Sequence, residues 1–178
     1  MQNSSVYIIS GKQGSGKTTM LKSIIGELKS NGVKVGGILA EGSWKNGIRE
    51  GFSLLRIIDN YTVPLCQSKP KKEYFDLGRF WFNPEAVKIG EEALRTNMTK
   101  DVDIIVIDEI GIFELQEKIW YSSFMKLLNK GSIPVLITVR EKIIKEVIEK
   151  FQLKNVIIFK SGEDTNSCAE VIIDGLDK

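Results

Sequence analysis

The feature that most constrains this chain is a glycine-rich segment near its N-terminus. The segment Gly11–Thr18 reads GKQGSGKT and matches the pattern G-x-x-x-x-G-K-[ST]. It follows the short apolar run Val6–Ile9 and precedes a stretch with helical periodicity from Lys17 to Lys29. A strand, a glycine-rich turn and a helix in this order form the context in which such a segment binds phosphate. We therefore expect a phosphate-binding loop (P-loop) on an α/β scaffold.

The chemistry of phosphate binding explains the residue types in this loop. Glycines allow the backbone angles that turn successive N–H groups inward, and the following helix points its positive end at the same place. Lys17 is expected to reach the β- and γ-phosphates, and the Thr18 hydroxyl is expected to bind Mg²⁺. With Arg140, which is discussed below, the predicted nucleotide-binding residues are Gly11, Lys12, Gln13, Gly14, Ser15, Gly16, Lys17, Thr18, Thr19 and Arg140.

A second chemical feature is the acidic pair Asp108–Glu109, which directly follows the apolar run Ile104–Ile107. In open parallel sheets, ligands bind beyond the carboxyl ends of the strands, so this pair should lie at the same edge as the glycine-rich loop. Asp108 is predicted to hold Mg²⁺, through water, because Mg²⁺ keeps several of its waters. Glu109 is predicted to orient or deprotonate an attacking water. Asp101 and Asp103 precede the strand and are expected at the opposite edge.

Apolar runs alternate with helical patterns along the chain, and this alternation predicts an α/β fold. We expect a three-layer P-loop NTPase fold with a mainly parallel sheet, built as a single domain over residues 1–178. Glu41–Phe82 is expected to be a small insertion on this sheet, and it contains an antiparallel hairpin of Gly51–Ile58 and Thr62–Gln67. The other expected strands are Val33–Ala40, Pro134–Val139 and Val156–Phe159. The other expected helices run from Asn83 to about Thr96, over Glu117–Asn129 and Glu141–Lys150, and in a short segment after Thr165.

Composition narrows the class of protein further. The chain has 178 residues, 42% of them hydrophobic and 27% charged, with a formal net charge of +2. These values are typical of a globular protein and do not favour nucleic acid as a partner, and no apolar run approaches the ~20 residues that span a bilayer. Cys66 and Cys168 are far apart and there is no histidine, so we expect no zinc site but buried, reduced thiols in a cytoplasmic protein. Without histidine, a carboxylate or the substrate itself must activate water.

Three segments together resemble a known family. They are the glycine-rich loop extended to Thr19, the R-x-G-F segment from Arg49 to Phe52, and the D-E-I-G box Asp108–Gly111 followed by Glu114–Leu115. This pattern is similar to that of the P-loop nucleoside-triphosphatase family that includes the human cancer-related nucleoside-triphosphatase, and the resemblance covers most of the chain. The chain departs from the family pattern where Ile112 and Phe113 replace a basic residue and a methionine.

The resemblance implies an arrangement of strands and an activity. The Pro134–Val139 strand would lie between the first strand and the strand before Asp108. This order would place Thr138 and Arg140 beside the γ-phosphate. Arg140 would then contact a phosphate or stack on the base, or it would form an ion pair with Glu141 or Glu146. Arg49 would either enter the site from the insertion or pair within the hairpin.

The expected function is Mg-dependent hydrolysis of nucleoside 5'-triphosphates to diphosphate and phosphate. The resemblance implies slow turnover of ATP, GTP and similar nucleotides, with loose base selectivity. Lys17 and Glu109 are the predicted catalytic residues, and Thr18 and Asp108 are the predicted metal ligands. Two alternatives remain open: a P-loop phosphotransferase acting on a small molecule or nucleotide, and a nucleotide-binding adaptor. Glu114 is expected to be an exposed helix residue, and nothing in the sequence identifies protein partners.

Overall fold

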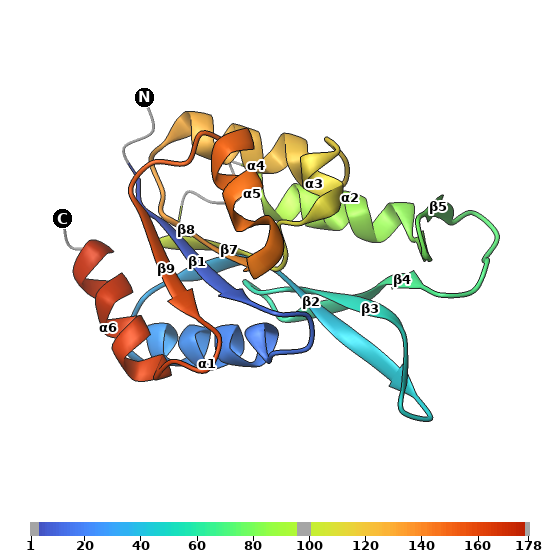
Figure 1. Ribbon diagram of the computed structural model, residues 1–178, viewed down its shortest axis with the longest axis horizontal. Helices are drawn as coiled ribbons and strands as arrows, with labels where there is room; N and C mark the ends of the chain where they lie inside the picture. Colours follow the sequence, from blue (N-terminus) through green and yellow to red (C-terminus); the bar gives the residue numbers. More distant parts are fainter. Residues whose placement is uncertain (1–3, 96–100, 177–178) are drawn as a thin grey trace.

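One nine-stranded mixed sheet organises the molecule, with strand order β5-β6-β4-β3-β2-β7-β8-β1-β9. The computed structural model describes residues 4–95 and 101–176 (Figure 1). The strands are β1 (Val6–Gly11), β2 (Val35–Lys45), β3 (Ile48–Arg56), β4 (Tyr61–Gln67), β5 (Phe75–Leu77), β6 (Phe80–Phe82), β7 (Ile104–Ile107), β8 (Val135–Arg140) and β9 (Val156–Lys160). The helices are α1 (Lys17–Ser30), α2 (Pro84–Ala93), α3 (Ile112–Leu115), α4 (Tyr121–Lys130), α5 (Ile144–Lys150) and α6 (Thr165–Leu176), with a 3₁₀ turn at Glu141–Ile143.

The sheet has a parallel half and an antiparallel half. Strands β2, β7, β8, β1 and β9 are parallel neighbours, whereas β2, β3, β4, β6 and β5 pair antiparallel. The prediction of a mainly parallel sheet is therefore wrong, whereas the antiparallel pairing predicted for Gly51–Ile58 and Thr62–Gln67 is confirmed as that of β3 with β4. The Glu41–Phe82 segment extends the sheet itself, because β2 continues to Lys45 and offers its outer edge to β3. The implied position of β8 between β1 and β7 is confirmed.

Local sequence signals set several helix ends. The side chain of Asn83 accepts a hydrogen bond from the Glu85 backbone N–H at 3.1 Å, so α2 begins as predicted. It ends at Ala93, and Thr96 lies outside the described residues. The helix predicted over Glu117–Asn129 begins only at Tyr121, as α4, because the backbone at Glu117 and Ile119 is left-handed. The single-turn helix α3, which precedes it, was not predicted.

Helices cover both faces of the sheet and enclose two apolar cores (Figure 1). Helices α2, α4 and α5 pack on one face, and α1 and α6 pack on the other. Strand β1 contributes side chains to both cores, because successive residues of a strand point to opposite faces. Ile8 lies in the first core, and Tyr7 and Ile9 lie in the second. Burial on both faces holds the central strands rigidly, and their carboxyl ends provide a fixed platform.

The structure bears on two expectations from composition, the state of the cysteines and the absence of a membrane span. Both cysteines are free and buried, and burial raises the pKa of the Cys66 thiol to about 12. Within the ranges 4–95 and 101–176, no helix has the length and apolar character needed to cross a bilayer. Single-domain organisation and cytoplasmic location stay predictions.

Candidate active site

The register of the parallel strands brings the predicted site residues to one edge of the sheet. Gly11, the last residue of β1, pairs with Arg140, the last residue of β8. On the other side of β8, Ile107, the last residue of β7, pairs with Ile137, so the residue that follows β7 lies level with Thr138. That next residue is Asp108, and the glycine-rich loop, the acidic pair and Arg140 therefore gather at the same edge.

Asp108 is the buried centre of this cluster, with only 3% of its surface exposed. Its Oδ2 accepts a hydrogen bond from Thr18 Oγ1 at 2.8 Å, and its Oδ1 accepts one from Thr138 Oγ1 at 2.5 Å. Burial raises the pKa of Asp108 to about 6, although the two hydroxyls act in the lowering direction. Thr18 and Asp108, both expected to bind metal, thus lie in direct contact. Sequence reasoning missed the contact between Thr138 and Asp108.

Lys17 spans the glycine-rich loop from the first turn of α1. Gly14 and Gly16 have φ values of 75° and 86°, which a residue with a Cβ adopts only with strain. Lys17 Nζ donates hydrogen bonds to the carbonyls of Gly11 at 3.2 Å and Lys12 at 2.9 Å. Burial lowers the pKa of Lys17, while the carboxylates of Glu109 and Asp108 act in the raising direction. The ammonium group is therefore held within electrostatic reach of both predicted acidic residues.

The outer part of the loop is open to solvent, and Ser161 packs against its base. Lys12, Gln13, Ser15 and Thr19 are all exposed. A Cβ at Gly11 would overlap the hydroxyls of Ser15 and Ser161, so this position needs glycine for lack of space. Ser161 N donates to the Ser10 carbonyl at 2.7 Å, which fixes the end of β9 beside the loop. Sequence reasoning missed Ser161, although its place at the carboxyl end of the last strand is a usable signal.

Glu109 and Arg140 form an ion pair, with Arg140 Nη2 2.9 Å from Glu109 Oε1. The two side chains are 34% and 44% exposed, so solvent screens the pair and its effect on stability is small. The sequence left open a phosphate or base contact for Arg140, or a pair with Glu141 or Glu146. The structure gives it Glu109 as partner. This pairing holds the predicted catalytic carboxylate at the mouth of the site.

Glu114 lies in the interior, and the prediction of an exposed helix residue is wrong. It is 3% exposed, and its two carboxyl oxygens accept hydrogen bonds from Gly111 N at 2.8 Å and Trp120 N at 3.2 Å. Burial raises the pKa of Glu114 to about 7, although both backbone donors act in the lowering direction. Because α3 is a single turn folded back toward α4, the carboxyl group ties the loop after Glu109 to the start of α4.

Arg49 lies within the hairpin formed by β2 and β3. Its guanidinium carbon is 4.5 Å from the centre of the Trp44 ring and 5.0 Å from that of Phe52. Of the two alternatives predicted for Arg49, the structure shows pairing within the hairpin and not entry into the site. An ion pair between Lys22 of α1 and Glu41 of β2 connects the base of this hairpin to the helix that follows the glycine-rich loop.

Comparison with known proteins identifies the family. The chain matches the sequence profile described as NTPase over residues 6–171. It belongs to this NTPase family. Among curated relatives, the nucleoside-triphosphatase THEP1 of Methanosarcina barkeri strain Fusaro is 32% identical over 149 residues, covering 81% of each chain. The nucleoside-triphosphatase THEP1 of Pyrococcus abyssi strain GE5 is 32% identical over 144 residues, covering 78% of this chain and 75% of the relative.

Two solved structures of nucleoside triphosphatases have a fold similar to that of this chain. The solution structure of a human cancer-related nucleoside triphosphatase aligns with a TM-score of 0.70 at 23% identity, covering 96% of both chains. The crystal structure of THEP1 from the hyperthermophile Aquifex aeolicus aligns with a TM-score of 0.70 at 20% identity, covering 97% of this chain and 99% of that one. At these identities the likeness concerns the fold.

The side chains of this NTPase offer few ligands for a metal ion. Within the described ranges, no group of three or more histidine, cysteine, aspartate or glutamate side chains could hold one. Thr18 and Asp108 nevertheless present a hydroxyl and a carboxylate in contact, and these are hard oxygen donors. A small oxygen donor set of this kind suits a Mg²⁺ ion that keeps most of its waters.

Proposed function

We propose that this chain hydrolyses Mg-bound nucleoside 5'-triphosphates to diphosphate and phosphate, accepting ATP, GTP and similar nucleotides with loose base selectivity. The observation that carries the proposal is the gathering of Lys17, the Thr18–Asp108 pair and Glu109 at one sheet edge. Membership of the NTPase family supports hydrolysis of nucleoside triphosphates.

The glycine-rich loop is the proposed phosphate-binding element. Its backbone N–H groups and the N-terminus of α1 would surround the β-phosphate, and Lys17 would move its ammonium group from the loop carbonyls to the β- and γ-phosphate oxygens. A triphosphate would replace these two contacts with neutral carbonyls by stronger ones in which both donor and acceptor are charged. Residues of the loop and its neighbours Thr19 and Arg140 complete the proposed nucleotide site.

Thr18 and Asp108 would hold the magnesium ion. When bound, the ion supplies positive charge that offsets the negative charge of the phosphates. The carboxyl group of Asp108 must be ionised for this role, and with a pKa of about 6 it is mostly ionised at neutral pH. Thr138 keeps the carboxylate in place through its 2.5 Å hydrogen bond.

Glu109 is the proposed water-directing residue. Its carboxylate would accept a hydrogen bond from a water, whose oxygen attacks the γ-phosphorus as the bond to the β–γ bridging oxygen breaks. The proton of the water passes to the carboxylate or to the released phosphate. Arg140 orients Glu109 through the 2.9 Å ion pair. Because this guanidinium is already paired with Glu109, we expect slow turnover, as in enzymes that lack a free arginine at the transferring phosphate.

Phosphate release from Mg-ATP and Mg-GTP tests this proposal. We expect release by the wild type, and a loss of about a hundredfold or more in Glu109→Gln with nucleotide affinity retained. The matched control is Glu141→Gln, which removes another exposed carboxylate near Lys17 and should keep wild-type turnover. Tight binding by the wild type without phosphate release would contradict hydrolysis. It would favour a phosphotransferase that lacks its acceptor, or a nucleotide-binding adaptor.

A further inference from the structure

Glu114 is a buried carboxyl group that the proposed hydrolysis does not use. It lies on α3, shortly after Glu109 along the chain, and only 3% of its surface is exposed. Its Oε2 accepts a hydrogen bond from Gly111 N at 2.8 Å, and its Oε1 accepts one from Trp120 N at 3.2 Å. The two oxygens therefore bind different backbone segments, one beside the active site and the other at the start of α4.

The side chain of Glu109 lies against Gly111. A Cβ at position 111 would be 3.3 Å from Glu109 Oε1 and 3.7 Å from the carboxyl carbon. The same Oε1 pairs with Arg140 Nη2 at 2.9 Å. The carboxylate of Glu109 thus contacts a guanidinium group and the backbone of Gly111, so a displacement of Gly111 would change its position.

The segments at the two ends of this connection are held firmly. Trp120 is 3% exposed, and a Cβ on Gly90 of α2 would lie 2.4 Å from Cη2 of its ring, so the ring is closely packed. Ile110 N donates to the Thr138 carbonyl at 3.0 Å, which attaches the loop to β8 just before Gly111. A carboxyl group that bonds to both segments therefore holds Gly111 in one place relative to the core.

The carboxyl group suits this place because it offers two acceptor oxygens to two N–H donors. The contact with Gly111 alone is the usual one of a glutamate in the first turn of a helix. Helix α3 has only four residues, however, and capping it does not require the second hydrogen bond, from Trp120. That second bond attaches the segment after Glu109 to a longer helix, which indicates a role beyond α3 itself.

We propose that Glu114 is a positioning residue for Glu109. Its carboxyl group holds the backbone of Gly111 in place, and Gly111 in turn limits where the Glu109 carboxylate can lie beside the attacking water. The inference rests on the proposed hydrolysis and concerns turnover alone. The hydrogen bonds of Glu114 go to Gly111 and Trp120, and neither residue is proposed to bind nucleotide.

Phosphate release and calorimetric titration with Mg-ATP test this role at pH 8, where Glu114 is mostly ionised because its pKa is about 7. Glu114→Gln has one acceptor oxygen and an NH₂ donor, so it leaves at least one of the two backbone N–H groups without a partner. We expect Glu114→Gln to lower kcat about tenfold, because small displacements of a catalytic group slow a reaction strongly. The dissociation constant of Mg-ATP should stay at the wild-type value.

Gly111→Ala tests the contact between Gly111 and Glu109 separately. The variant keeps both hydrogen bonds of Glu114, and the backbone there is extended, with a φ of −141°, so a Cβ adds no left-handed strain. The added Cβ presses on Glu109 Oε1. We expect kcat to fall about tenfold here too, with unchanged Mg-ATP affinity. This variant keeps the inference testable even if Glu114→Gln does not fold.

A double variant separates positioning from a general loss of structure. If Glu114 acts only through Glu109, adding Glu114→Gln to Glu109→Gln should leave single-turnover phosphate release as slow as in Glu109→Gln alone. General damage to the fold would instead slow release in both backgrounds.

The position of Glu109 can also be followed without turnover. We expect the carboxyl-carbon NMR resonance of Glu109, assigned with Glu109→Gln, to shift in nucleotide-free Glu114→Gln and Gly111→Ala. A wild type that binds Mg-ATP without releasing phosphate would refute the proposed hydrolysis. The resonance would still show whether Glu114 holds Glu109, so the two failures are distinguishable.

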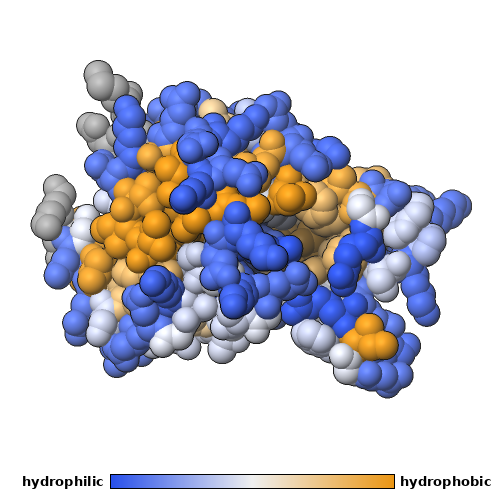
Figure 2. Space-filling model, viewed as in Figure 1, coloured by the Kyte–Doolittle hydropathy of each residue, from blue (hydrophilic) through white to orange (hydrophobic). Residues whose placement is uncertain are grey.

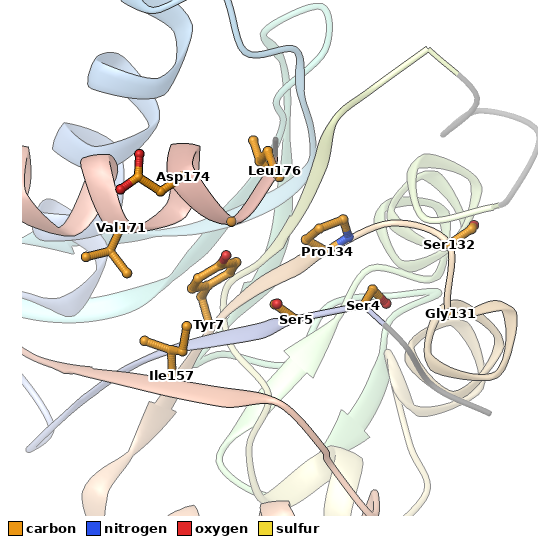
Figure 3. Close-up of a pocket in the computed structure, with 11 residues that line it drawn as sticks. Ser4, Ser5, Tyr7, Gly131, Ser132, Pro134, Ile157, Val171, Asp174 and Leu176 are labelled. Carbon is orange, nitrogen blue, oxygen red and sulfur yellow. The ribbon is translucent and has the colours of Figure 1, made fainter. Parts of the chain in front are cut away.

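Two exposed acidic side chains provide matched controls. Glu117 follows α3 in the same loop and pairs with Lys150 of α5. Asp174 of α6 lies beside a hollow at the opposite edge of the sheet (Figure 3). An apolar surface over β9, which includes the exposed Ile157 and Ile158, separates α6 from α5 (Figure 2). Glu117→Gln and Asp174→Asn should keep the wild-type kcat and the wild-type resonance of Glu109.

Any of the following results would overturn the inference. These are a wild-type kcat in Glu114→Gln, an unshifted Glu109 resonance in that variant, or a further loss of turnover when Glu114→Gln is added to Glu109→Gln. A loss of Mg-ATP affinity in proportion to the loss of kcat would also overturn it, because Glu114 would then hold the nucleotide site as a whole and not Glu109.

Discussion

Replacing Glu114 by glutamine should change how the free energy of unfolding depends on pH. Glu114 has a pKa of about 7 in the folded chain, above the ordinary value of 4.5, because its carboxyl group is buried. Between these two pH values the folded state keeps a proton that the unfolded state has released. This proton linkage stabilises the folded state fully below the ordinary pKa, and the contribution is lost as the pH rises through about 7.

The size of the effect follows from the two pKa values. Each tenfold change in a protonation equilibrium is worth about 1.4 kcal/mol, so Glu114 contributes roughly 3 kcal/mol across this range. Glu114→Gln has no titrating group at this position. The stability of the wild type relative to the variant should therefore fall by roughly 3 kcal/mol between pH 4.5 and pH 8. Asp108, whose pKa is also raised, titrates in both proteins and cancels in the difference.

Urea unfolding of the nucleotide-free protein in EDTA measures this difference at intervals of half a pH unit. The control variant Glu146→Gln changes an exposed glutamate of α5 and should follow the wild-type curve. A wild-type-minus-Glu114→Gln difference that stays constant from pH 4.5 to pH 8 would refute the reasoning. It would mean that the carboxyl group ionises as easily in the folded chain as in the unfolded one.

Two further predictions concern the candidate active site. Lys17→Ala should abolish tight triphosphate binding, because it removes the ammonium group that lies against the loop carbonyls of Gly11 and Lys12, and unchanged affinity in a calorimetric titration would contradict this role. Thr138→Val should destabilise the nucleotide-free chain by about 2 kcal/mol at pH 8, because it leaves the buried Asp108 carboxylate with one donor fewer. Thr138→Ser keeps the hydroxyl and loses only a buried methyl group, so it should be destabilised by about 1 kcal/mol, less than Thr138→Val. Equal midpoints for the two variants would count against the contribution of this hydrogen bond.

Sequence alone determined the elements that depend on neighbouring residues. The glycine-rich loop between an apolar strand and a helix, the Asn83 helix start and the strand before Asp108 all follow from local backbone preferences and hydrophobic periodicity. The edge of the sheet at which Asp108 lies also follows, because the residue after a parallel strand can only be at its carboxyl end. Asp103, at the other end of that strand, accepts a hydrogen bond from Lys34 N at the opposite edge, as expected.

Only the tertiary structure decided which side chains become partners. The sequence suggested Glu141 and Glu146, close along the chain, as acidic partners of Arg140, whereas the register of β8 beside β7 brought it to the distant Glu109. Glu114 is buried because α3 folds back toward α4, which no local pattern encodes. The strands of the Glu41–Phe82 segment carry apolar residues that fit either a separate hairpin or a continued sheet. Strand β2 fixed the choice, because it pairs with the distant β7 on one side and turns directly into β3 at Asn46–Gly47 on the other. The segment therefore continues the main sheet and leaves no open edge between the two parts.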